Sequence, residues 1–244
     1  MIPALRPLAQ LLLSPAAFFD ERPPKTTLPI AVGIVVLYTI ALVLAVSLVG
    51  SMLAGAIDAT VTMDNPDRPP EMVCETYEDD ADSLVTEGCS EPETIERDAG
   101  ELVQEAVHDS LGFAVFAPLL LWALGTGTLY AVGRLAGGTP SFTGVLSLAG
   151  WAALPEFVRL AIGLVGLRVA LSDVTITDVD RSVDALEAAM APLDPLLLVA
   201  SLVTIGWQWY LLTGGLASEA DIPNGAAALG VGIPLGLFSL VTLF

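Results

Sequence analysis

Positive charge is the scarcest property of this 244-residue sequence. Eight arginines and one lysine, Lys25, stand against 28 acidic residues, and the net charge is −19 at pH 7. Proteins that bind nucleic acid neutralise phosphates with Lys and Arg, and this chain has too few of either. It also has one histidine, His108, and two cysteines, Cys74 and Cys89. This scarcity argues against dense metal clusters and histidine-based catalysis, so we expect no nucleic-acid partner and no cofactor.

Charged residues of both signs together make up 15 % of the chain, whereas a soluble globular domain carries about 25 %. Hydrophobic residues reach 54 % and the mean hydropathy is +0.72. A water-soluble fold could not bury that much apolar surface. The composition therefore predicts an all-α integral membrane protein.

Five stretches are long enough to cross the bilayer as helices, which takes about 20 residues. Four are uncharged, and the other contains Glu156, Arg159 and Arg168. Pro155 could divide this charged stretch into two half-helices. We predict a five-helix transmembrane bundle with spans at 29–53, 111–133, 144–171, 195–217 and 222–244.

The distribution of Lys and Arg predicts the orientation, because cytoplasmic loops carry an excess of them. Segment 1–28 holds three basic residues, whereas the much longer segment 54–110 holds two. We therefore expect the N-terminus in the cytoplasm and the C-terminus outside the cell membrane. A cleaved signal peptide is the alternative for the first span, but its apolar run far exceeds the roughly 7–15 residues of a signal sequence.

The acidic residues gather in two outer loops. Segment 54–110 has 17 acidic residues against two arginines, and 172–194 has six against one. One interpretation is a surface that binds cations. The interpretation we favour is an acidic, lysine-poor exterior that retains water and hydrated ions in high salt, as in halophilic proteins.

These outer loops also show structural patterns. Thr60–Met63 and Val174–Thr177 alternate as short strands do. Ile95, Ala99, Leu102 and Ala106 recur at helical spacing, which predicts that the second span begins as a helix outside the membrane. We expect a small acidic extracytoplasmic cap built from both loops; the alternative is two independent loops.

Cys74 and Cys89 both fall in the outer segment 54–110. An oxidising compartment favours one disulfide over two free thiols, and their spacing does not match the CxxC motif of redox enzymes. Closing this loop would stabilise the segment by about 3 kcal/mol in the chain-entropy model.

Segment 1–28 is predicted to be a cytoplasmic interfacial amphipathic segment. Ser14-Pro15 is a typical helix start, and it leads into Phe18 and Phe19. The helix could lie in the interface plane with both rings toward the acyl chains. Alternatively, it packs on the inner end of the bundle. The pattern does not separate these two arrangements.

Glu156 and Arg159 are the candidate intramembrane polar pair. They lie on the same helical face, and an intramembrane charge is a candidate functional site. A half-helix beginning at Pro155 would place Glu156 in its first turn, where the helix dipole favours a carboxylate. The alternatives are an ion pair that neutralises itself inside the bundle, or an Arg159 that reaches to the interface. Because HExxH and GxSxG motifs are absent, we predict that the protein is not an enzyme.

Two stretches carry a resemblance to a known family. The first is Leu12-Leu13-Ser14-Pro15-Ala16-Ala17-Phe18-Phe19. The second is Gly137-Gly138-Thr139-Pro140-Ser141-Phe142, which enters a span with Leu154-Pro155 in its middle. The pattern resembles the Yip family of Ypt/Rab-interacting membrane proteins. The resemblance implies five membrane helices, a cytoplasmic N-terminus and a C-terminus on the far side; the acidic insertion 54–110 departs from a compact member.

Eukaryotic members of this family are associated with vesicle traffic and Rab GTPases through a longer hydrophilic N-terminal region, for which 28 residues leave little room. We therefore predict a non-enzymatic scaffold whose partners are the lipid bilayer and other membrane or surface proteins, or a second copy of itself. The alternative is a transporter or permease subunit with Glu156 and Arg159 lining a polar path. Such a path needs polar groups on other spans, and the available ones are Thr126, Thr128, Ser147, Thr204 and Gln208.

Overall fold

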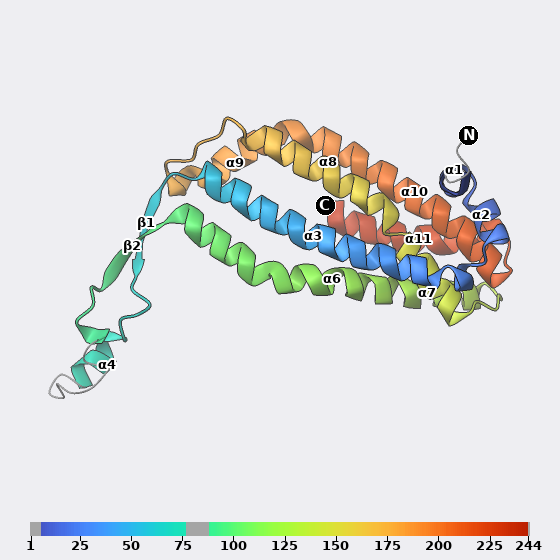
Figure 1. The fold of residues 1–244 in the computed structure, drawn as a ribbon, viewed down its shortest axis with the longest axis horizontal. Helices are drawn as coiled ribbons and strands as arrows, with labels where there is room; N and C mark the ends of the chain where they lie inside the picture. The colour runs from blue at the N-terminus through green and yellow to red at the C-terminus, as the bar shows by residue number, and fades with distance from the viewer. Residues whose placement is uncertain (1–5, 77–87, 244) are drawn as a thin grey trace.

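The computed structural model describes residues 6–76 and 88–243. Long helices lie side by side in a bundle, and a strand ribbon projects from one end of it (Figure 1). The elements in chain order are α1 (Arg6–Leu13), α2 (Pro15–Glu21), η2 (Pro24–Thr26), α3 (Leu28–Ala56), β1 (Thr60–Asp64), α4 (Glu71–Thr76), β2 (Thr94–Asp98), α6 (Ala99–Leu135), α7 (Phe142–Trp151), α8 (Leu154–Leu171), η3 (Val179–Arg181), α9 (Ser182–Met190), η4 (Ala191–Leu193), α10 (Asp194–Ala220) and α11 (Asn224–Leu243).

Three helical segments are long and apolar enough to cross a membrane. These are α3, α6 and the segment Val179–Ala220, which ends with α10. The helix α11 is also apolar, and its qualifying stretch Asn224–Leu240 is shorter. The chain is therefore an all-helical membrane protein apart from the two-stranded ribbon of β1 and β2, named here the outer ribbon because it projects from the bundle.

The predicted third span is formed by two helices, α7 and α8. Between the two helices the regular bond to the fourth preceding residue gives way to a bond to the third, as from Ala153 N to Gly150 O at 3.2 Å. Pro155 explains the break, because it has no N–H and its ring would clash with the carbonyl four residues earlier in a continuous helix. Pro155 itself is fully buried in the first turn of α8.

The outer ribbon pairs β1 with β2 in antiparallel register, from Thr60 opposite Asp98 to Asp64 opposite Thr94. It extends away from the helices and carries α4 at its far end (Figure 1). The predicted strand at Thr60–Met63 is present, but the helical interpretation of Ile95 is wrong. Ile95 pairs with Met63 inside β2, and the helix begins at Ala99 because the Asp98 side chain accepts a hydrogen bond from Glu101 N.

The other predicted strand, Val174–Thr177, is reduced to a single bridge. Ile176 pairs with Ile57 just beyond the end of α3. Main-chain hydrogen bonds run from Ile176 N to Ala56 O and from Asp58 N to Ile176 O. Segments 54–110 and 172–194 therefore meet at the base of the ribbon. The pairing stays at one bridge, with one bond to the last residue of α3 and the other from Asp58 just beyond it.

The main hydrophobic core lies where α2, α7 and α10 meet, a region named here the α2 end of the bundle. Phe19, Leu148, Leu211 and Leu216 are all fully buried there. The start of α7 and the end of α10 lie at this same end (Figure 1). The outer ribbon lies at the opposite end.

Candidate functional site

Glu156 and Arg159 form an ion pair in the first turns of α8. The Glu156 Oε2 atom lies 2.7 Å from Arg159 Nη2. The other oxygen, Glu156 Oε1, accepts a hydrogen bond of 2.8 Å from Gln208 Nε2 on α10. Glu156 is 17 % exposed and Arg159 is 44 % exposed. Oε1 therefore has a hydrogen bond, whereas the buried Oε2 has none from the residues that the structure describes and is compensated by the ion pair with Arg159 alone.

Gln208 joins the pair to the helix break. Its Nε2 also donates to the main-chain oxygen of Ala152, at 3.0 Å. This carbonyl belongs to the α7–α8 connection, where helical hydrogen bonds are interrupted. One amide therefore stabilises both the buried carboxylate and an orphaned carbonyl.

Three of the other polar residues of the predicted path bond elsewhere. Thr126 and Thr128 donate to carbonyls of their own helix, at Trp122 and Leu124. Ser147 hydrogen-bonds with Thr27 at 3.0 Å. Thr204 is buried. Among these five candidates, Gln208 is the one that the structure brings to the pair.

A cavity of about 390 Å³ lies beside the ion pair. Residues of α3, α6, α7, α8, α10 and α11 line it, and most of them are apolar. Its polar lining comes mainly from Glu156, Arg159, Gln208, Thr128 and Tyr38. Tyr38 packs edge-to-face on Phe157, with ring centroids 5.3 Å apart. Sequence reasoning missed Tyr38, because a single tyrosine in an uncharged span carries no pattern.

The cavity and its pair do not resemble a metal centre. Within residues 6–76 and 88–243, no group of three or more His, Cys, Asp or Glu side chains could hold a metal ion. The pair is also electrically neutral, so it offers no surplus charge to a cation. What the arrangement offers chemically is a set of hydrogen-bond donors and acceptors in an apolar surrounding.

The motif residues of α2 are buried at the α2 end. Phe18 and Phe19 contact Trp151 edge-to-face, with ring centroids 5.4 and 6.3 Å away. Phe19 is fully buried, as is Pro15. The rings thus belong to the protein core, which is the second of the two arrangements open for this segment. Exposed apolar side chains remain on α1, at Leu12 and Leu13.

A buried hydrogen-bond chain supports the aromatic cluster. Trp151 Nε1 donates to Thr27 Oγ1 at 3.0 Å, and Thr27 Oγ1 lies 3.0 Å from Ser147 Oγ. The hydroxyl of Thr27 also bonds to the carbonyl of Pro24. Each polar atom that the cluster buries therefore has a partner, which avoids the cost of an unsatisfied group.

The Gly-Gly-x-x-Ser-Phe motif forms the turn between α6 and α7. Gly137 has φ +82°, a left-handed conformation that favours glycine. A Cβ on Gly138 would overlap the carbonyl oxygen of Ala220 at the end of α10. Ser141 caps α7 by accepting from Gly144 N. Phe142 is 61 % exposed and contacts the ring of Tyr130.

Glu219, which sequence reasoning missed, joins this turn to α10. Its Oε1 accepts hydrogen bonds from both the main-chain N and the hydroxyl of Ser141. A Cβ on Gly144 would overlap its carboxyl group. The carboxylate therefore sits at the N-terminus of α7, where the helix dipole favours it. The sequence contains one sign of this role, because Glu219 is an acidic residue in the last turn of a helix, where the helix dipole disfavours negative charge.

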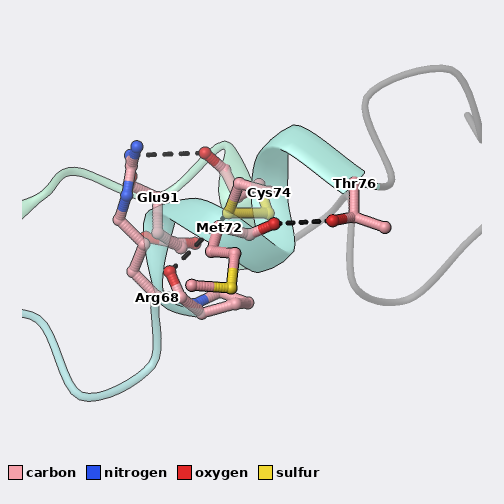
Figure 2. Close-up of a disulfide and its surroundings, with 7 residues drawn as sticks. Arg68, Met72, Cys74, Thr76 and Glu91 are labelled. Carbon is pink, nitrogen blue, oxygen red and sulfur yellow. Dashed lines mark hydrogen bonds between the residues drawn. A yellow bond between two sulfur atoms is a disulfide. The ribbon is translucent and has the colours of Figure 1, made fainter.

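The predicted disulfide is present at the tip of the ribbon. Cys74 in α4 is bonded to Cys89, 15 residues later. Arg68 donates to the main-chain oxygens of Cys89 and Glu91, and Met72 lies beside the bridge (Figure 2). The disulfide and Arg68 together join the segment that follows β1 to the segment that precedes β2.

Removing the disulfide should loosen the tip and leave the bundle intact. The double variant Cys74→Ser/Cys89→Ser should lose about 3 kcal/mol of local stability, because it releases a closed loop. Limited proteolysis should then cut between residues 65 and 93 much faster than in the parent, with unchanged thermal unfolding of the helices. Equal cleavage rates would show that Arg68 and the ribbon suffice to hold the tip.

The Yip1 domain, as a family sequence profile, matches residues 9–244. The match includes all the motif residues, the ion pair and the outer ribbon. No curated protein and no solved structure matches the chain.

Proposed function

The chain belongs to the Yip1 domain family, and from this premise we propose that it is a non-enzymatic scaffold of the cell membrane. The family motifs support this proposal, because Phe19, Gly138 and Ser141 act in packing and capping. The intramembrane pair supports it as well, because Gln208 and Arg159 occupy the carboxylate oxygens of Glu156. These residues build a rigid bundle that presents other surfaces to partners.

We also propose that five segments cross the bilayer: α3, α6, α7 with α8, α10 and α11. The third crossing contains charges, and the neutral pair of Glu156 and Arg159 makes them tolerable at depth, since isolated intramembrane charges are costly. Five crossings put the two termini on opposite sides of the membrane. The three basic residues of segment 1–28 support a cytoplasmic α2 end, with the outer ribbon outside the cell.

Cysteine labelling tests this orientation with two exposed positions at opposite ends. Val183 in α9 is 72 % exposed and Leu135 at the end of α6 is 89 % exposed. A membrane-impermeant maleimide added to intact cells should label Val183→Cys and spare Leu135→Cys. After permeabilisation both should react. Labelling of Leu135→Cys in intact cells would invert the orientation.

The outer ribbon is the surface that we propose for protein partners, because it projects from the bundle (Figure 1). Asn65 N already donates to Glu93 O across the ribbon, at 3.0 Å. A two-residue Asn-Gly turn can therefore replace residues 66–92 without disturbing β1 and β2. This shortened variant removes the tip alone.

Quantitative co-purification from mild detergent then tests the scaffold. Proteins that co-purify in fixed ratio with the parent should be lost from the shortened variant. The Cys74→Ser/Cys89→Ser variant is the control with full chain length, and it should keep part of the binding. A parent that elutes without any protein in fixed ratio, or partners retained equally by all three chains, would contradict the proposal.

The cavity favours one second candidate, a transporter or permease subunit with Glu156 and Arg159 lining a polar path. Flux of protons or Na⁺ into vesicles that contain the purified chain would support it. In that case Glu156→Gln should abolish flux while leaving the unfolding temperature nearly unchanged. The engaged carboxylate oxygens make the scaffold the better-supported function.

A further inference from the structure

We propose that the cavity beside Glu156 and Arg159 binds a membrane-soluble molecule with an uncharged, oxygen-bearing head group and an apolar tail. This inference does not depend on the scaffold proposal. It rests on the size and lining of the cavity, the hydrogen-bonding groups at one wall, and an opening between two helices.

The cavity has the dimensions and lining of a ligand site. Its volume of about 390 Å³ falls in the range of small-molecule pockets, which are mostly apolar with a few placed polar groups. Leu121 and Trp122 of α6 and Leu235 of α11 contribute apolar walls. Water has few partners along such walls, so an apolar tail is the better occupant.

The polar wall selects the head group. Glu156 uses both carboxylate oxygens on Arg159 and Gln208, and Gln208 Nε2 is shared with Ala152. Arg159 carries five N–H donors and directs one nitrogen to Glu156. Arg159 and Tyr38 both line the cavity, and their remaining N–H and O–H donors are the groups that would bind an oxygen acceptor on the ligand.

A charged head group is disfavoured at this depth. The Glu156–Arg159 pair is already neutral, so an anionic head would leave one negative charge uncompensated in an apolar surrounding, which is costly. A cationic head would meet the same penalty and the Arg159 guanidinium. Hydroxyl, ester or carbonyl oxygens avoid both penalties.

The exposed side chains of the cavity lining assign its opening to the side of α6 and α11. Leu124 on α6 and Phe238 on α11 both line the cavity, and they are 58 % and 50 % exposed. Both side chains thus line the cavity and also reach the surface of the bundle, which points to an opening at this place. Both helices are apolar, and the opening therefore faces the acyl chains, from which a membrane-soluble ligand would enter.

Three probes with the same tail and different heads test the proposal on the full chain in detergent. They are 1-decanoylglycerol, decyl phosphate and decane, each brominated at the end of the tail. Bromine quenches indole fluorescence on contact, and Trp122 lines the cavity. Half-quenching by the glycerol ester should need at least tenfold less probe than the other two, as a hydrogen bond from a charged donor provides about that factor.

Two glycines of α6 give a filled cavity and a matched control. Gly125 lines the cavity, and a Cβ there would lie 3.9 Å from its nearest neighbour, Ala149. Gly125→Leu should raise the half-quenching concentration of the glycerol ester at least tenfold. Gly127 lies outside the cavity lining with open space around it, so Gly127→Leu should leave that concentration within twofold.

Each other outcome would contradict the proposal in a different way. Equal quenching by decane would refute recognition of the head group, and tighter binding of decyl phosphate would assign the site to anions. Equal quenching of the two leucine variants would place the probe elsewhere on the bundle. If Gly125→Leu does not elute as the parent does, Thr128→Leu fills the same cavity and decides the result.

Discussion

Arg159→Gln is expected to destabilise the protein more than Glu156→Gln, although the two residues form one ion pair. Removing one partner of a buried pair costs about 3–5 kcal/mol. Here we expect about 2–3 kcal/mol for Arg159→Gln, because Arg159 is 44 % exposed and the pair is therefore not fully enclosed by the protein. That variant leaves the Glu156 carboxylate, 17 % exposed, with the amide of Gln208 as its remaining partner.

Glu156→Gln should cost about 1 kcal/mol, since a guanidinium that is 44 % exposed can extend its long side chain toward the membrane interface and keep its charge hydrated. The Gln side chain also keeps an oxygen for Gln208 Nε2. The double variant should be more stable than Arg159→Gln alone, because it contains no uncompensated charge. Thermal unfolding in detergent measures all three, and strictly additive losses would show that the two side chains do not interact.

The sequence predicted the helices well and the outer ribbon only in part. A long apolar run such as 29–53 can cross a membrane only as a helix, because a helix satisfies the hydrogen bonds of its own backbone groups. Ile95 shows the limit. Its spacing to Ala99 fits a helix, yet pairing with Met63 on β1 extends it into a strand. That choice depends on a partner 32 residues away, which a local pattern does not contain.

The sequence predicted the part of the candidate site that residues close in sequence form with one another. Glu156 and Arg159 are three residues apart on one helix, so their contact follows from helical geometry. Gln208 and Tyr38 reach the same place from α10 and α3, and helix packing alone brings them there. Glu219 is similar: its partner Ser141 lies 78 residues earlier, so no spacing rule pairs them.

Two phenylalanines of the family motifs should respond to alanine to very different extents. Phe19→Ala should destabilise the protein by about 3–5 kcal/mol, the usual cost of removing a buried ring and leaving a cavity. Phe19 is fully buried and contacts Phe18 and Trp151 edge-to-face, with centroids 5.1 and 6.3 Å away. Its ring also lies against Gly215 of α10, so its loss should release α2 from the bundle.

Phe142→Ala is the matched control, because it removes the same side chain from the other family motif. Phe142 is 61 % exposed and makes one ring contact, with Tyr130 at 6.4 Å, so the loss should stay within about 1 kcal/mol. Thermal unfolding compares the two variants, and the rate of trypsin cleavage after Lys25, which directly follows α2 and the Pro23–Pro24 pair, reports whether α2 has detached. If Phe142→Ala costs as much as Phe19→Ala, the exposed ring must be covered by a partner in the membrane. If neither variant is destabilised, α2 does not hold the α2 end together.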